Sequence, residues 1–306
     1  LSGKKNINNK FLFYFLKLDN FENLINQTAL PALGLYDIKN NRIVLPNLNK
    51  QNKIVDYLDK ETSKIDRKIS ILEQKFDKLE EYKQSIIFET VTKGLDSNVE
   101  MKDSGIDWVG DIPAHWDIFR LKDVVKYINL PKAKVNTNNY LEIGDIDIKT
   151  KTYNITNKDK LSVDTARLAP KGTLLISTVR PNRGGIVITK YKHPVSAAFC
   201  AIKNPSKFWF YFVQTRGFMN ELIKMNMDAT YPTCKDMDII KQVVCVPTKT
   251  EQEKIADYLD SVCLKVDKKK EIIKKQIDLL KEYKQTIIYE DRKSTRLNSS
   301  HSDRSR

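Results

Sequence analysis

The chain contains 306 residues, 41% of them hydrophobic, and carries 53 Lys and Arg against 39 Asp and Glu, a net charge of +14. The hydrophobic content excludes a disordered protein and allows one or two packed domains. No run of about 18 uncharged apolar residues exists, and the first residues are polar, so we expect no membrane span, no signal peptide and a cytoplasmic location. Because the first residue is Leu, we expect the reading frame to begin further upstream.

Two segments of the chain repeat each other. Residues 46–89 align with residues 247–290 at a constant offset of 201 without a gap, and 21 of 44 positions are identical. The similarity extends upstream more weakly, where the segment Lys10-Phe-Leu-Phe-Tyr-Phe15 resembles Lys207-Phe-Trp-Phe-Tyr-Phe212. We therefore interpret the chain as two copies of one unit, with residues 1–45 as the remnant of the first copy's front half.

Both copies predict a long helix, over 46–93 and 247–290. Apolar residues recur at alternating steps of four and three, each helix should begin after Pro46 or Pro247, and the first should stop at Gly94. Neither helix can bury its apolar stripe alone, and a pseudo-twofold arrangement is closed, so we expect an antiparallel coiled coil. The predicted interface residues are Ile54, Leu58, Ile65, Leu72, Phe76 and Leu79, with Ile255, Leu259, Val266, Ile273, Ile277 and Leu280.

A predicted globular domain, residues 94–246, lies between the helices in the sequence. Residues 101–246 contain 22 Lys and Arg against 14 Asp and Glu, whereas both helices are nearly neutral, so the basic excess favours a polyanion-binding domain. Short β-like runs over 140–148, 173–179, 185–189 and 195–202, then a helical pattern over 208–225, predict an α/β or α+β fold. We expect Trp108 and Trp116 in the core, and Thr233 as the N-cap of a short helix.

A turn between two of the predicted strands is the candidate DNA contact. In the segment Thr178-Val-Arg-Pro-Asn-Arg-Gly-Gly185, Pro and Gly favour a tight projecting turn. An Arg side chain can pair with guanine or phosphate, and an Asn side chain with adenine. A solvated hairpin without a ligand stays open as the alternative. The predicted DNA-binding residues are Thr178, Arg180, Asn182 and Arg183, with Lys134 and Tyr231 as further candidates.

No catalytic or metal site is predicted in this chain. The four cysteines, Cys200, Cys234, Cys245 and Cys263, form no C-x-x-C pair, so we expect reduced and mostly buried thiols. The acid-x-Lys fragment Asp147-Ile-Lys149 lacks a second placed acid, and no G-x-x-x-x-G-K phosphate loop occurs. A coiled-coil adaptor without DNA specificity and a self-contained nuclease are the alternative functions.

An ordered set of motifs resembles the specificity subunits of type I restriction-modification systems, in which two target-recognition domains alternate with two long helices. The resemblance extends from about Phe11 to Glu290 and implies that 94–246 is the second recognition domain. The motifs are Trp108-Val-Gly-Asp-Ile-Pro-Ala-His-Trp116, Thr230-Tyr-Pro-Thr233, Val246-Pro247 with Glu251-Gln-Glu-Lys-Ile255, and Thr90-Val-Thr-Lys-Gly-Leu95.

This resemblance implies a non-catalytic scaffold that reads DNA for other subunits. Its implied partners are double-stranded DNA, two modification (adenine methyltransferase) subunits and restriction subunits, and each recognition domain would read half of a bipartite site. S-adenosylmethionine, ATP and magnesium would serve the partners, with no cofactor in this chain. Residues 291–306 depart from the repeat and resemble a translated sequencing adapter, so we expect them to be disordered.

Overall fold

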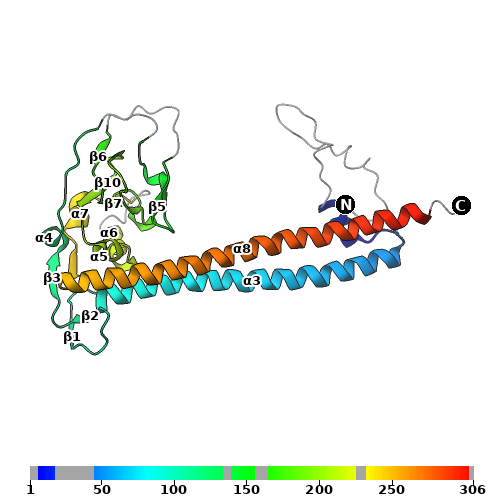
Figure 1. The fold of residues 1–306 in the computed structure, drawn as a ribbon, viewed down its shortest axis with the longest axis horizontal. Helices are drawn as coiled ribbons and strands as arrows, with labels where there is room; N and C mark the ends of the chain where they lie inside the picture. The colour runs from blue at the N-terminus through cyan, green and yellow to red at the C-terminus, as the bar shows by residue number, and fades with distance from the viewer. Residues whose placement is uncertain (1–5, 18–44, 134–138, 156–164, 225–231, 303–306) are drawn as a thin grey trace. The chain divides into compact units, whose positions relative to one another are not determined.

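The computed structural model describes residues 6–17, 45–133, 139–155, 165–224 and 232–302, with side chains to Glu290 except that of Asn182. The chain divides into two compact units, residues 1–79 with 267–306 (unit 1) and residues 80–266 (unit 2). Two long helices, α3 (Leu48–Lys93) and α8 (Lys249–Ser302), run side by side and contribute to both units (Figure 1).

The ends of the helices follow the sequence signals. Each helix begins two residues after its proline, and the Asn47 side chain caps α3 by accepting the Lys50 N–H at 2.9 Å. Helix α3 ends at Lys93 because Gly94 adopts φ +78°, where its N–H still reaches the Thr90 carbonyl at 3.1 Å. The predicted start of both helices and the predicted stop of the first are therefore confirmed.

In unit 1, α3 and α8 pack antiparallel. The ammonium of Lys284 donates to both Asp66 carboxylate oxygens, at 2.5 and 2.6 Å, and Lys270 lies 4.5 Å from the centroid of the Phe76 ring. Residues with increasing numbers along α3 therefore face residues with decreasing numbers along α8. The seam contains these buried or half-buried apolar residues: Ile54, Leu58, Ile65, Ile69, Leu72, Ile273, Ile277, Leu280, Ile287 and Ile288. Phe76 and Leu79 are half-buried on the same helix.

One polar clamp occurs in both units. In unit 1, helix α1 (Asn9–Lys17) is held to α3, and in unit 2, helix α5 (Lys207–Phe212) is held to α8. In each case an Asp of the long helix accepts hydrogen bonds from a Lys and a Tyr placed one helical turn apart on the short helix. The residues are Asp59 with Lys10 and Tyr14, and Asp260 with Lys207 and Tyr211. The repeat seen in the sequence therefore corresponds to the same side-chain contacts in both units.

Unit 2 is an α+β fold in which every strand pair of the described residues is antiparallel. Its central sheet has the order β10 (Phe199–Lys203), β7 (Thr173–Ser177), β8 (Ile186–Ile188), and β7 is buried along its whole length. The other pairs are β1 (Met101–Asp103) with β2 (Asp111–Pro113), β3 (Asp117–Arg120) with β11 (Val243–Val246), β4 (Ile146–Asp147) with β5 (Thr152–Tyr153), and β6 (Arg167–Ala169) with β9 (His193–Val195).

The core of unit 2 joins the sheet to the ends of both long helices. Ile87 and Val91 of α3 and Ile255 and Leu259 of α8 belong to the same buried cluster as β7, α5 and α6 (Arg216–Lys224), and Val266 is buried as well. Burying these side chains holds the domain on the helix pair, since each large apolar side chain contributes about 1.5–3 kcal/mol.

The predicted core tryptophans have different surroundings. Trp116 is fully buried, and Trp108 is half-buried against Phe88 and Phe212, with ring centroids 6.4 and 5.8 Å away. The expectation that both rings pack in the core is confirmed.

Three local predictions for this domain are wrong. The run 140–148 is a 3-10 turn, η2 (Ile143–Asp145), before the short β4, because the Asp145 carboxylate accepts the Glu142 N–H at 2.8 Å and tightens the chain. The helical run 208–225 is divided into α5 and α6, since the N–H groups of Gln214 and Thr215 bond carbonyls three residues back. Thr233 is no N-cap: α7 (Asp236–Ile240) begins after Lys235, whose N–H donates to Asp238 at 2.7 Å.

The C-terminal segment also differs from the prediction of disorder. Helix α8 continues past Glu290 to Ser302. This segment contains neither Pro nor Gly, so no residue in it interrupts the backbone hydrogen bonding of the helix.

Candidate nucleic-acid interface

The turn between β7 and β8 contains two arginines on a fixed backbone. It contains a 3-10 turn, η3 (Pro181–Arg183), closed by hydrogen bonds from the Arg183 N–H to the Arg180 carbonyl (2.9 Å) and from the Gly184 N–H to the Pro181 carbonyl (2.8 Å). Arg180 and Gly184, which flank it, both have positive φ, +49° and +69°. Pro181 is buried beneath the turn, Arg180 is half-buried and Arg183 is exposed.

One flank of this turn pairs with the segment that follows α6. The Arg180 N–H donates to the Pro232 carbonyl at 2.8 Å, and the Cys234 N–H donates to the Thr178 carbonyl at 2.8 Å. Val179 and Thr233 form an antiparallel bridge between these bonds. Two motifs that lie about 50 residues apart in the sequence thus form one short ladder.

The other flank is held by the hairpin of β4 and β5. The ammonium of Lys151, in the turn of this hairpin, donates to the Gly184 carbonyl at 2.7 Å. Burial lowers the pKa of Lys151 to about 8, while the nearby carboxylates of Glu80 and Asp147 act to raise it and Lys83 acts to lower it. The turn is therefore fixed on both sides, which leaves the Arg183 side chain as its exposed basic group.

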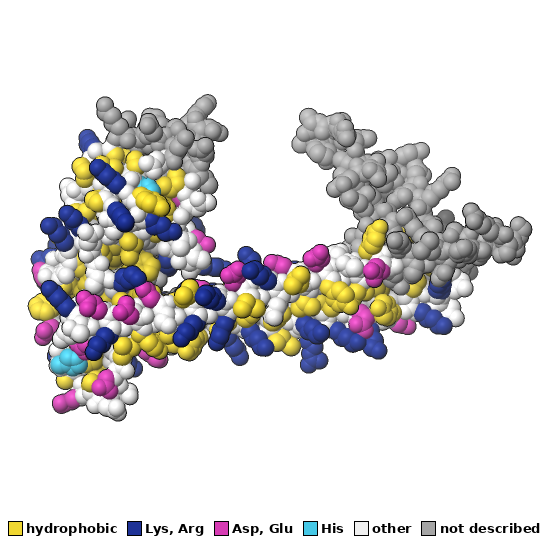
Figure 2. Space-filling model, in the orientation of Figure 1, with side chains coloured by type: hydrophobic (Ala, Val, Ile, Leu, Met, Phe, Trp, Pro, Cys, Tyr) yellow, Lys and Arg dark blue, Asp and Glu magenta, His cyan; other side chains and the backbone are white. Residues whose placement is uncertain are grey.

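The electrostatics of unit 2 suit a polyanion. Figure 2 shows Lys and Arg side chains spread over the visible face of this unit. They are exposed on several strands and helices, and the acidic side chains of the same segment are fewer, 14 against 22 over residues 101–246. The exposed basic residues of this unit include Lys126, Lys149, Lys171, Arg183, Lys190, Lys192, Arg216 and Lys235. Such a distribution raises the local concentration of a phosphate backbone.

Comparison with known protein families identifies the family of this chain. The family model "Type I restriction modification DNA specificity domain" matches residues 1–81 and 113–282, which is most of the chain. The chain belongs to this family. It is thus a specificity subunit of a type I restriction-modification system, the non-catalytic DNA-recognition component.

Individual relatives agree with this assignment. The Type I restriction enzyme MjaVIII specificity subunit of Methanocaldococcus jannaschii is 25% identical over 91% of the chain and 68% of its own length. The MjaIX specificity subunit of the same organism is 26% identical over 55% of the chain and 43% of its own length.

Solved structures share the fold. A chain from work on complex assembly and conformational transition of the type I R-M system has a TM-score of 0.73 at 19% identity, covering 95% of this chain and 72% of that one. The HsdS subunit from Thermoanaerobacter tengcongensis has a TM-score of 0.52 at 20% identity, covering 94% and 70%. These likenesses concern the fold alone.

The structure brings together part of the predicted site of the specificity subunit. Arg180 and Arg183 share one turn, while the Thr178 side chain is buried, so Thr178 supports the turn through its backbone. The Asn182 side chain, Lys134 and Tyr231 lie outside what the structure describes. Sequence patterns do not reveal the role of Lys151, because its link to Gly184 depends on how two hairpins meet. The turn-forming segment Asp147-Ile-Lys-Thr150 could have indicated only the hairpin of β4 and β5.

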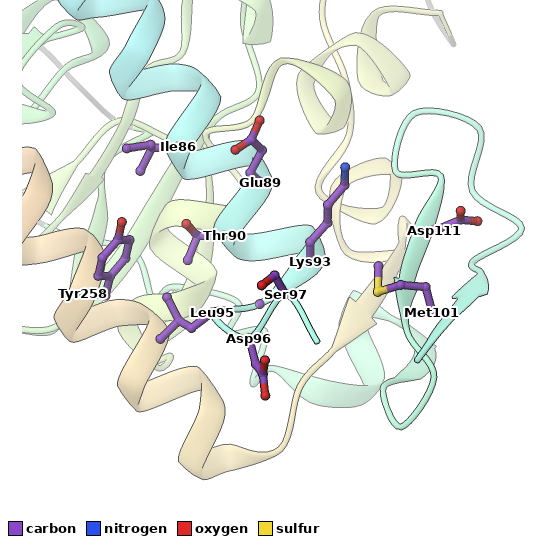
Figure 3. Close-up of a pocket in the computed structure, with 11 residues that line it drawn as sticks. Ile86, Glu89, Thr90, Lys93, Leu95, Asp96, Ser97, Met101, Asp111 and Tyr258 are labelled. Carbon is purple, nitrogen blue, oxygen red and sulfur yellow. The ribbon is translucent and has the colours of Figure 1, made fainter. Parts of the chain in front are cut away.

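A cleft of about 550 Å³ lies elsewhere in unit 2, where α3 ends (Figure 3). Glu89, Asp96 and Asp111 line it together with the single basic residue Lys93, and Tyr258 of α8 closes one side. The excess of carboxylates makes this cleft a poor site for a nucleic acid.

The remaining chemistry of the described residues is structural. All four cysteines are buried thiols rather than disulfides, as expected, and burial raises the pKa of Cys234 to about 11 and that of Cys245 to about 12, so these two thiols stay protonated. No three His, Cys, Asp or Glu side chains among the described residues gather as metal ligands. No helix within the described ranges is long and apolar enough to cross a bilayer.

Proposed function

We propose that unit 2 is a target-recognition domain that reads one half of a bipartite duplex DNA site through the turn at residues 180–184. The observation that carries this proposal is the turn itself, which contains two arginines and is held by hydrogen bonds on both flanks. A preorganised Arg pays less conformational entropy when it pairs with a guanine or a phosphate. The Thr230-Tyr-Pro-Thr233 motif supplies one of those flanks through Pro232 and Thr233.

The repeated clamp supports a second DNA-reading domain attached through α1. Asp59 and Asp260 hold equivalent short helices, and the one held by Asp260 belongs to the core of the recognition domain. By the same arrangement, α1 is the attachment helix of a first domain. Two domains carried by equivalent clamps would read two half-sites.

Repeated exposed residues support two copies of one partner, which we propose to be the modification (adenine methyltransferase) subunits. Three pairs at the offset of 201 keep large apolar side chains in solvent in both copies, with exposures from 41% to 57%. Exposed aromatic and aliphatic side chains at matching positions are typical of protein interfaces. The pairs are Tyr57 with Tyr258, Ile71 with Ile272, and Tyr82 with Tyr283.

Modification and cleavage of DNA would then be catalysed by the partner subunits. In this proposal S-adenosylmethionine serves the modification subunits, and ATP and magnesium serve restriction subunits that join for cleavage. The specificity subunit directs both to the DNA site and holds no cofactor.

A gel-shift series across salt concentrations, with and without a co-expressed modification subunit, tests the proposal. We expect binding that sharpens with the partner and weakens steeply with salt, because phosphate contacts release counterions. Salt-insensitive or absent DNA binding in both states would support the coiled-coil adaptor instead. Metal-dependent cleavage by the purified chain would support the nuclease.

A further inference from the structure

Lys151 occupies a position that is costly for a lysine. Its backbone has φ +54°, a left-handed conformation that glycine and asparagine adopt more readily and that costs other residues about 1–2 kcal/mol. The side chain is half-buried, and burial lowers its pKa to about 8. An ordinary hairpin turn needs neither a strained lysine nor a desolvated ammonium, so this residue calls for a role of its own.

The ammonium acts on the candidate recognition turn. Lys151 Nζ donates to the carbonyl of Gly184, the residue that ends η3 with φ +69°. A Cβ at Gly184 would lie 2.8 Å from Lys151 Nζ, so the ammonium would have to move, and the positive φ of Gly184 would strain any other residue. The Lys151 ammonium and the conformation of Gly184 together determine the direction of the backbone directly after Arg183.

The charged groups facing Lys151 come from two elements. Glu80 and Lys83 lie on α3, and Asp147 lies on β4 at the start of the same hairpin. Their opposing effects leave burial as the dominant influence on the amine. Its hydrogen bond to a neutral carbonyl is strongest while the amine is charged.

We infer that Lys151 is a positioning residue for DNA recognition, which holds the turn at residues 180–184 in the shape that presents Arg183 to the duplex. This inference rests on the proposed function. Losing the amine should leave the fold intact, because the other flank of the turn keeps its bonds from Arg180 to Pro232 and from Cys234 to Thr178.

The test compares Lys151→Met, Lys151→Gly and Lys151→Arg with Lys171→Met. Lys171 is an exposed lysine beside the opposite end of the β7–β8 hairpin and serves as the matched control. Lys151→Gly removes the amine and favours the positive φ, so it separates loss of the amine from a turn that fails to form. Near-ultraviolet circular dichroism and the unfolding midpoint verify the fold of each variant.

The probe is a duplex selected from a random pool by the wild-type chain with its modification subunits, beside a duplex of the same composition with the selected bases scrambled. We expect Lys151→Met and Lys151→Gly to weaken binding of the selected duplex by about tenfold or more. Binding of the scrambled duplex should change by less than about twofold, because no phosphate contact is lost. Lys171→Met should leave the preference for the selected duplex unchanged.

A pH profile gives a readout that a merely structural role would not move. For the wild type, the preference for the selected duplex should fall as the pH rises from about 7 to about 9, through the pKa of Lys151, whereas Lys151→Arg should lose this dependence because a guanidinium stays charged. Equal weakening of both duplexes by Lys151→Met, or an unchanged preference, would overturn the inference. A wild type that selects no sequence would overturn the proposed function, and the inference with it.

Discussion

Gly217, near the start of α6, touches the face of the Trp108 ring. A Cβ at this position would lie 2.0 Å from Trp108 Cε3, so the ring or the helix would have to move. Glycine normally weakens a helix relative to alanine by about 1 kcal/mol, yet here the missing side chain is what allows the packing.

We predict that Gly217→Ala destabilises the protein in spite of the better helix propensity. Overpacking of a well-filled core costs about 1–3 kcal/mol, which exceeds the propensity gain. Urea unfolding monitored by tryptophan fluorescence measures the difference. Gly144→Ala is the control, since a Cβ there meets no atom within 4 Å. An equal or higher stability of Gly217→Ala would contradict this packing.

The two arginines of the turn should contribute to specific DNA binding. Arg180→Ala and Arg183→Ala should each weaken binding of a selected duplex by about 1–3 kcal/mol if they contact base edges. Titration of a labelled duplex at fixed salt measures the loss. Arg120→Ala, at an exposed position of β3, is the matched control and should cost far less. Unchanged affinity in both turn variants would remove this turn from the site.

Glu251 joins the segment at His115 and Trp116 in unit 2 to the start of α8. Its carboxylate accepts hydrogen bonds from His115 Nε2 at 2.7 Å, Trp116 Nε1 at 3.2 Å and the Thr248 N–H at 3.0 Å, the last as part of a capping box. Burial raises the pKa of Glu251, but these bonds outweigh it and lower the pKa from 4.5 to about 2.

We predict an acid-sensitive contribution of Glu251 to stability. Because its folded pKa is depressed, the contribution is complete above the unfolded value of 4.5 and is lost as the pH falls toward about 2. Glu251→Ala should therefore lower stability at neutral pH by about 0.5–2 kcal/mol, with the difference from wild type shrinking below about pH 4.5. Lys50→Ala, at the repeat-equivalent position in α3, should show no such change in its stability difference from wild type below about pH 4.5. A difference independent of pH would refute the assignment.

At the scale of elements, the long helices and the strands β7 and β8 could be predicted, whereas the turn at 143–145 and the division between α5 and α6 could not. The heptad pattern, with Pro46, Pro247 and Gly94 as boundaries, depends only on local spacing. The turn at 143–145 and the break at Gln214 and Thr215 depend on single hydrogen bonds that compete with the regular ladder. Periodicity contains no information about such bonds.

The residues of the candidate site could likewise be predicted only where the local sequence determines their structure. Arg180 and Arg183 could be predicted as site residues because the residues beside them favour a turn. The burial of Thr178 and the reach of Lys151 follow from which hairpin lies beside which, and that is decided by packing of the whole unit.

The repeated clamp gives a prediction at the element scale. Tyr211→Phe and Tyr14→Phe each remove one hydrogen bond to an Asp of a long helix, from Tyr211 at 2.6 Å and from Tyr14 at 2.8 Å. We expect each to cost about 0.5–1.5 kcal/mol, measured by chemical unfolding. Tyr153→Phe, which removes the hydrogen bonds to His193 and from the Lys190 N–H outside the clamps, is a control for the loss of any tyrosine hydroxyl. Hydrogen exchange should show faster opening of α5 in Tyr211→Phe and of α1 in Tyr14→Phe. Protection unchanged at both short helices would mean that the clamps do not hold them.

At the scale of the whole molecule, the chain is a specificity subunit built from a duplicated helix and clamp. The duplication explains why one sequence contains two equivalent helix ends and matching exposed residues, and it fits the proposal that one partner binds in two copies, because two copies need two equal faces. The basic excess lies in residues 101–246 rather than in the nearly neutral helices.

The central claim is that the turn at residues 180–184 gives this subunit its sequence preference. Selection from a random duplex pool by the chain with its modification subunits, repeated with the Arg180→Ala, Arg183→Ala double variant, tests it most directly. We expect a block of specified base pairs for the wild type that disappears in the double variant, while salt-sensitive binding to unselected DNA persists. The same block recovered by both proteins would contradict the account.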